Sequence, residues 1–226
     1  MIIASDFDGT IFIDNKISED DIKAIKDFQQ AGNLFAIVTG RSYHSLEAII
    51  LGKLEPDFII ANNGSHILAR EEKVLKEIYS FPIHVEDGKK FMEVYKAYKP
   101  LAFTDYGSFS KIEDAKGEIR ALGIYTNEKL INKFADKFDF HYSIGVIDVV
   151  NNGIDKQKGI DIMKAYYSYE GDVIAVGDDY NDIGFLSATP LSYTLSYVEN
   201  QEVIKVCKYK IDSISELIRR LIWIIR

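Results

Sequence analysis

Short apolar runs alternate with amphipathic segments through the first third of the chain. Residues 2–7, 34–38 and 58–61 have the composition of buried strands, and apolar residues recur at helical spacing in segments 18–32 and 42–51 between them. Adjacent parallel strands need a crossover connection, usually a helix. This βαβαβ order therefore predicts a parallel sheet that is covered by helices on both faces.

The same alternation returns late in the chain, where we predict a helix over residues 156–169 and a strand over 173–176. The middle of the chain differs, because it has two amphipathic segments among strand-like runs. The helices predicted there cover residues 85–98 and 128–138, and the strand-like runs include 101–104 and 142–150. This pattern indicates a small α+β unit within the chain.

We therefore expect an α/β fold with two domains. Residues 1–81 and 153–226 form a doubly wound, Rossmann-like core, and residues 82–152 form a smaller α+β domain inserted into it. No low-complexity linker marks these limits. In the last segment, one helical face is apolar and consists of Leu217, Ile218, Leu221 and Ile222.

Charge and cysteine content exclude several functions. The formal net charge of −8 argues against nucleic acid or an anionic membrane as the main partner. Cys207 is the only cysteine, which excludes an intrachain disulfide and a thiolate zinc site. The first residues do not resemble a signal peptide, and the apolar segment 214–225 is interrupted by charges and too short to cross a bilayer. A cytoplasmic protein is expected.

Asp6 and Asp8 lie two residues apart where the first predicted strand ends. A spacing of two places both carboxylates on one side of an extended chain, at the sheet edge where open α/β sheets bind ligands. Gly9 and Thr10 follow and provide a turn whose backbone N–H groups can approach an anion. The alternative is an ordinary turn at a strand end, since Asp and Gly are common in turns.

Clustered carboxylates next to an anionic phosphate require a cation, and magnesium is the cation that we expect. An ionised Asp6 needs no base to attack phosphorus, but it is repelled by a phosphate dianion unless a metal is present. Asp8 can give a proton to the departing oxygen and later accept one from water. We expect both residues also to contribute to the metal site.

Two further segments carry polar residues at predicted strand ends. Thr39, followed by Gly40 and Arg41, ends the second strand, and its hydroxyl can donate to a phosphate oxygen, although a helix cap or turn is the alternative. Asp178 follows the late strand, with Asp182 one helical turn further on, and both are candidate magnesium ligands. We expect Gly40 and Asn181 to contact the substrate.

The lysines that begin the late predicted helix, Lys156 and Lys158, are candidates for a fixed positive charge that binds the phosphate. Lys156 lies nearer to the loop that enters the helix. An acidic site with an anionic substrate carries more negative charge than one magnesium ion balances, so one of these lysines is expected in it.

Together these segments resemble the haloacid dehalogenase superfamily, and the large insert between Thr39 and the lysine is similar to its Cof-type phosphatases. The resemblance implies that Asp6 is the nucleophile, Asp8 the general acid/base, Thr39 and Lys156 the phosphoryl-binding residues, and Asp178 and Asp182 magnesium ligands. Lys156 fits because it precedes Gly159 by three residues, whereas Lys158 requires a shifted register.

The inserted domain then corresponds to a mobile cap that chooses the substrate. At around 70 residues it looks closer to small-capped, phosphoglycolate-type phosphatases. The expected function is hydrolysis of a small phosphorylated metabolite, such as a sugar phosphate or phosphoglycolate, by a monomer or homodimer. A phosphomutase or a non-catalytic sensor are the alternatives. Lys111, Arg120 and His141 are candidate cap contacts, each with a structural role as the favoured explanation.

Overall fold

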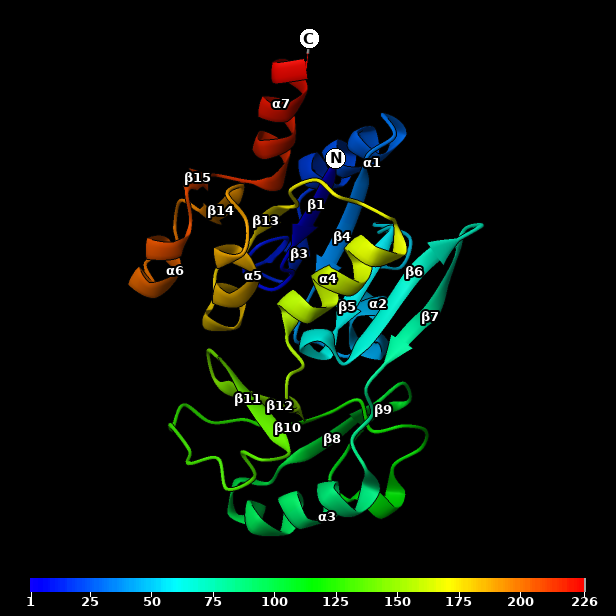
Figure 1. Ribbon diagram of the computed structural model, residues 1–226, viewed down its shortest axis with the longest axis vertical. Helices are drawn as coiled ribbons and strands as arrows, with labels where there is room; N and C mark the ends of the chain where they lie inside the picture. The colour runs from blue at the N-terminus through cyan, green and yellow to red at the C-terminus, as the bar shows by residue number, and fades with distance from the viewer. Residues whose placement is uncertain (226) are drawn as a thin grey trace.

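The computed structural model describes the backbone of residues 1–225 and the side chains of residues 1–221. Two sheets dominate the molecule, one above the other in Figure 1. The upper, core sheet has eight strands in the order β15-β14-β13-β1-β4-β5-β6-β7. Its strands are β1 (Ile2–Ser5), β4 (Leu34–Val38), β5 (Phe58–Ala61), β6 (His66–Glu71), β7 (Val74–Ser80), β13 (Ile174–Val176), β14 (Ser192–Leu195) and β15 (Tyr209–Ile211).

Neighbouring strands from β15 to β5 are parallel, and β6 and β7 continue the sheet in antiparallel pairing. The central strands β1, β5 and β13 are buried along their whole length. This is why they appear in the sequence as uninterrupted apolar runs instead of alternating ones. A short hairpin, β2 (Phe12–Ile13) and β3 (Lys16–Ile17), follows β1.

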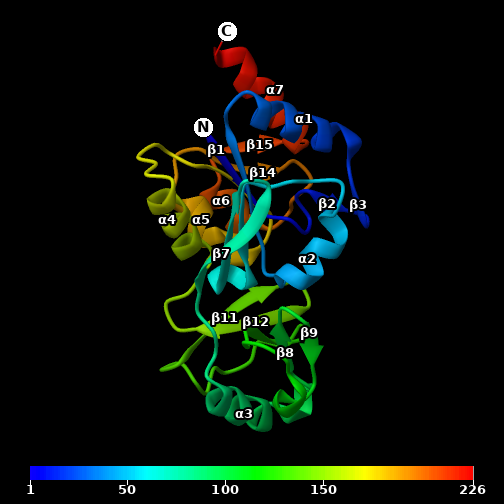
Figure 2. The same cartoon turned by 90° about the vertical axis from the view of Figure 1, so that its right-hand side faces the viewer.

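Helices cover both faces of the core sheet. They are α1 (Glu19–Gln30), α2 (Tyr43–Ile50), α4 (Lys156–Tyr166), α5 (Ile183–Ser187), α6 (Gln201–Val206) and α7 (Ile214–Ile225). Figure 2 shows α4 and α5 on one face and α1 and α2 on the other. The predicted doubly wound core is confirmed. The N-cap of α2 is Ser42, whose hydroxyl accepts a hydrogen bond from Ser45 N at 3.3 Å.

The apolar face predicted for α7 packs on the core. Leu217 and Ile218 are buried, and Leu221 is partly buried against the same cluster. The side chain of Ile222, like those of residues 223–226, lies outside the described part of the chain. Among the described residues, no helix is both long enough and apolar enough to cross a membrane.

The inserted domain is a five-stranded antiparallel sheet with α3 (Val85–Val94) on the face away from the core (Figure 1). Its strands, in the order β11-β12-β10-β8-β9, are β8 (Leu101–Thr104), β9 (Gly107–Phe109), β10 (Ala121–Ile124), β11 (Phe138–Ser143) and β12 (Val146–Asn151). Two segments join it to the core, residues 81–84 and 152–155. The sequence places the domain limits in these segments.

Alternation along β12 divides its side chains between the two faces of this sheet. Ile147 and Val149 join the cluster under α3, whereas Val150 belongs to a separate small cluster on the opposite side. Asp148, which lies between Ile147 and Val149, therefore faces the core.

The helix predicted over residues 128–138 is wrong. Residues 125–137 form a loop that ends in turns at 133–137 and contains no helix or strand. The partly buried Leu130 and Phe134 still pack on the cluster under α3. Side chains bind the backbone groups that a helix would use. Asn132 bonds to Phe134 N and Phe138 O, and the Tyr95 hydroxyl bonds to Ile131 O and Lys133 N. Such side-chain bonds compete with helix formation.

Candidate active site

The carboxyl ends of β1, β4 and β13 meet at the edge of the core sheet that faces the inserted domain. A cavity of about 510 Å³ lies at this edge and is lined by both domains. The core contributes Asp6, Asp8, Thr39, Gly40 and Asp178, among others, and the inserted domain contributes Phe103, Tyr125, Ser143, Ile144, Val146 and Asp148. This is the crevice at which open α/β sheets bind ligands.

Lys156 is a buried cation between two buried carboxylates. Its Nζ atom lies 2.6 Å from Asp6 Oδ1 and 2.5 Å from Asp182 Oδ1, and its side chain is 1% exposed. It reaches this position because it is the first residue of α4, whose N-cap, Asp155, accepts a hydrogen bond from Lys158 N. Lys158 is exposed to solvent. The structure therefore brings Lys156, and not Lys158, next to the predicted nucleophile.

Asp6, Asp178 and Asp182 each offer a carboxylate oxygen, and these atoms lie within 4.8 Å of one another. Asp182 Oδ2 accepts hydrogen bonds from the backbone N–H groups of Asp178 and Asp179 at 2.9 and 3.0 Å. Asp178 in turn accepts a bond of 2.6 Å from the Thr10 hydroxyl. Both predicted acidic segments thus meet in one cluster, although they are far apart in sequence.

The cluster has the properties of a divalent-cation site. Burial and repulsion by Asp182 raise the pKa of Asp178 to about 7, and the same two effects raise the pKa of Asp6. Burial alone would lower the pKa of Lys156, but Asp182 and Asp6 outweigh it and raise that pKa. One lysine against three carboxylates leaves two negative charges, which one magnesium ion balances with the hard oxygen ligands that it prefers.

We expect Asp178→Asn to make the metal-free protein more stable at pH 8. A carboxylate whose pKa is raised from 3.8 to about 7 contributes stability that is present below pH 4 and is lost as pH rises through 7. Removing its charge should raise the thermal midpoint in EDTA at pH 8 by a few degrees. The stabilisation that magnesium gives the wild type should disappear.

Differential scanning calorimetry at pH 5.5 and pH 8, with EDTA and then with magnesium, measures both effects. Asp136→Asn, at an exposed position of the inserted domain, makes the same charge change away from the site and serves as the control. Equal stabilisation of Asp178→Asn and wild type by magnesium would show that Asp178 is not a metal ligand.

Asp8 lies beside the cluster without joining it. Its two oxygens accept hydrogen bonds of 2.6 Å from Nε and Nη2 of Arg41, a bidentate ion pair. Arg41 also lies over the rings of Phe7 and Phe12. The Asp8 side chain is not among the three that could share one ion here, so its predicted contribution to the metal site stays a prediction.

Thr39 is buried at the end of β4 and lines the cavity. Its Oγ1 atom accepts a hydrogen bond of 3.0 Å from Arg41 N, which leaves its own O–H group available to donate. Gly40 also lines the cavity, and a Cβ atom there would lie 2.6 Å from Asp148 Oδ2. Gly40 is therefore needed for the close approach of the inserted domain.

Sequence reasoning missed a hydrogen-bonded chain that links the two domains. Asn181 Nδ2 donates to Asn63 Oδ1 at 3.1 Å, and Asn63 Nδ2 donates to Asp148 Oδ2 at 2.9 Å. Asn63 has φ 52°, the left-handed region that Asn tolerates better than most residues. In the sequence, the Asn62-Asn63-Gly64 turn at the end of a predicted strand could have indicated Asn63 as a site residue. The indication for Asp148 is weaker: it is a single acid within an apolar run.

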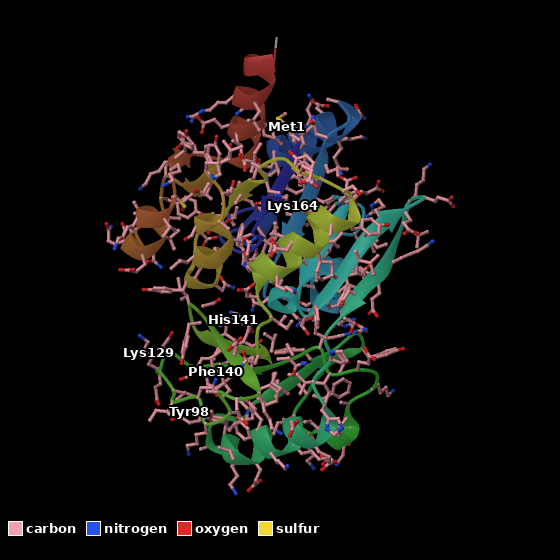
Figure 3. All side chains as sticks on the ribbon, viewed as in Figure 1. Met1, Tyr98, Lys129, Phe140, His141 and Lys164 are labelled. Carbon is pink, nitrogen blue, oxygen red and sulfur yellow. The ribbon has the colours of Figure 1, made fainter. Side chains whose placement is uncertain are left out.

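The three candidate cap contacts do not line the cavity. Lys111 is exposed, and Arg120 is buried in ion pairs with Glu77 and Asp105. His141 bonds through Nε2 to Ile154 O at 2.8 Å, beside the segment that returns to the core (Figure 3). Arg120 and His141 thus stabilise the contact between the domains instead of facing the site.

The fold and the site together define a two-domain α/β protein whose inserted cap covers a metal-competent carboxylate and lysine cluster. A family model described as haloacid dehalogenase-like hydrolase matches residues 3–116 and 110–216. The chain belongs to this family, which confirms the resemblance indicated by its motifs.

Individual relatives agree with this assignment. The chain is 27% identical over 206 residues to a phosphoglycolate phosphatase of Sulfurisphaera tokodaii, an alignment that covers 86% of the chain and 80% of the relative. It is similar in fold to a subclass IIB sugar phosphatase of the superfamily, with a TM-score of 0.81 and 20% identity. The comparison covers 97% of this chain and 98% of the other. The chain is also similar in fold to a superfamily phosphatase from Bacteroides thetaiotaomicron, with a TM-score of 0.79 and 22% identity. That comparison covers 98% of this chain and 94% of the other.

Proposed function

We propose that the protein is a magnesium-dependent phosphatase that hydrolyses a small phosphomonoester through an aspartyl-phosphate on Asp6. The observation that carries this proposal is the position of Lys156 between Asp6 and Asp182, next to Asp178. A carboxylate nucleophile that lines the cavity then lies next to a fixed cation and a set of oxygen ligands. The names of the relatives, a phosphoglycolate phosphatase and a sugar phosphatase, support the same reaction class.

The groups of the site divide the tasks of this reaction among them. Lys156 binds Oδ1 of Asp6, and no described residue donates a hydrogen bond to Oδ2, so Oδ2 is the oxygen that attacks phosphorus. The Thr39 hydroxyl donates a hydrogen bond to a phosphoryl oxygen, and Lys156 offsets the negative charge of the carboxylates and the phosphate. Asp6, Asp178 and Asp182 would hold magnesium, which reduces the repulsion between nucleophile and phosphate when it is bound.

Asp8 is the group that moves protons. In the first step the P–O bond to the alcohol breaks as the Asp6 oxygen bonds to phosphorus, and Asp8 protonates the departing oxygen. In the second step water attacks the same phosphorus, Asp8 takes its proton, and Asp6 leaves as a carboxylate. Both oxygens of Asp8 are bonded to Arg41, so the first step requires Asp8 to move away from Arg41 before it can reach the departing oxygen.

A panel of phosphorylated metabolites and one aryl phosphate, assayed with magnesium and then with EDTA, tests this function. We expect phosphate release that requires the metal, with an aryl phosphate turned over more slowly than the best metabolite. No release from any ester, together with measurable binding of one, would favour a sensor. Isomerisation of a sugar phosphate without net phosphate release would favour a phosphomutase.

A further inference from the structure

Asp148 is the one carboxylate that the inserted domain contributes to the cavity lining. It is 9% exposed, and Asn63 donates to its Oδ2 atom. No described residue donates a hydrogen bond to Oδ1. A nearly buried carboxylate with a free oxygen at a cavity wall lacks a partner that a bound molecule can supply.

The surroundings of Asp148 distinguish it from the other acids in the cavity. Asp6 is paired with Lys156, Asp178 is bonded by Thr10, and Asp8 is paired with Arg41. Asp179 accepts bonds from the backbone N–H groups of Ile144 and Tyr180. Asp148 has a neutral amide as its only described donor.

Positive charge is scarce on the side of the cavity formed by the inserted domain. Arg41 is the only Lys or Arg among the described residues that line the cavity, and Asp8 already occupies it. The wall opposite the nucleophile consists of aromatic and aliphatic side chains, one serine and Asp148. A second anionic group of a substrate would therefore meet a carboxylate without a compensating cation.

We propose that Asp148 determines specificity, by accepting a hydrogen bond from a hydroxyl group of a neutral leaving group and by disfavouring leaving groups that carry a carboxylate. The inference rests on the proposed phosphatase function and selects, between its two substrate classes, the polyol or sugar phosphate over the phosphoglycolate type. The backbone explains the placement, because Asp148 alternates with the buried Ile147 and Val149 and fits against Gly40 only where no Cβ intervenes.

Glycerol 3-phosphate and 3-phosphoglycerate form a matched pair of probes, since they differ in one hydroxymethyl group against one carboxylate. Burial raises the pKa of Asp148 to about 7, so the assay is run at pH 8, where its carboxylate is mostly ionised. We expect the wild type to have a kcat/KM at least about 10-fold higher for glycerol 3-phosphate, as a charged hydrogen-bonding partner contributes to binding. The Asp148→Asn substitution keeps the size and should lower this ratio about 10-fold.

The ratio is taken within each protein, so a general loss of activity does not affect it. Asp136→Asn changes the same charge at an exposed site of the same domain and should retain the wild-type ratio. A wild type that prefers 3-phosphoglycerate, or an unchanged ratio in folded Asp148→Asn, overturns the inference and leaves the phosphatase function intact. No phosphate release from these esters or from an aryl phosphate overturns the function itself, and the inference with it.

Discussion

Replacing the nucleophile by Asp6→Asn should lower magnesium-dependent phosphate release from an aryl phosphate by at least about 10⁴-fold, the scale seen when a catalytic nucleophile is removed. The amide of Asn has nearly the shape of the carboxylate but does not attack phosphorus. Folding should persist, because the ionised Asp6 is already disfavoured by burial and by Asp182, which raise its pKa. Circular dichroism and the thermal midpoint check the fold.

The covalent step has its own readout. Acid quenching of the wild type during turnover, followed by trypsin and mass spectrometry, should find one added phosphoryl group on the peptide of residues 1–16, and Asp6→Asn should lack it. Asp136→Asn should behave as wild type in both assays. Full activity in Asp6→Asn would remove Asp6 as the nucleophile, whatever the stability of the variant.

Replacing the buried cation by Lys156→Met should destabilise the metal-free protein by about 3–5 kcal/mol, since it leaves two buried carboxylates without their common partner. Met retains most of the aliphatic length, so little cavity is created and the loss reports the charge. Urea unfolding in EDTA at pH 8 measures it. Magnesium should restore part of the lost stability, because the ion also balances Asp6 and Asp182.

Lys158→Met is the matched control, two residues away on the same helix. The Lys158 side chain is exposed, so its replacement should change the free energy of unfolding by less than about 0.5 kcal/mol. Phosphatase activity should be lost in Lys156→Met and kept in Lys158→Met. Similar stabilities for the two variants would show that Lys156 is not the cation that neutralises the cluster.

Four of the eight core strands, β1, β4, β5 and β13, were predicted, because each is an apolar run between turn residues. The bounds Leu34–Val38 and Phe58–Ala61 agree with the structure, and α2 begins after its predicted cap, Ser42. The predicted helix over residues 128–138 failed for a tertiary reason. The Tyr95 hydroxyl, from over thirty residues earlier, bonds to the backbone at residues 131 and 133, and helical spacing in the sequence carries no information about that contact.

The acidic segments could be placed at one sheet edge from sequence because parallel strands share the edge at which their carboxyl ends lie. Which acids share an ion could not be deduced in this way. Asp6 and Asp8 look equivalent in the sequence, yet only Asp6 faces Asp178 and Asp182, while Asp8 pairs with Arg41. A spacing of two fixes the side of the chain but not the partner.

By itself, the sequence determined the βαβ order of the core, the presence of an inserted domain and the kinds of chemical groups at the strand ends, because these follow from local periodicity and composition. Only the tertiary structure decided that Lys156 bridges Asp6 and Asp182 and that Asp148 reaches Asn63 and Gly40. Those contacts join residues up to 150 positions apart. The Lys156 contacts depend on how the strands and helices of the core pack, and the Asp148 contacts depend on how the two domains pack against each other; local pattern specifies neither.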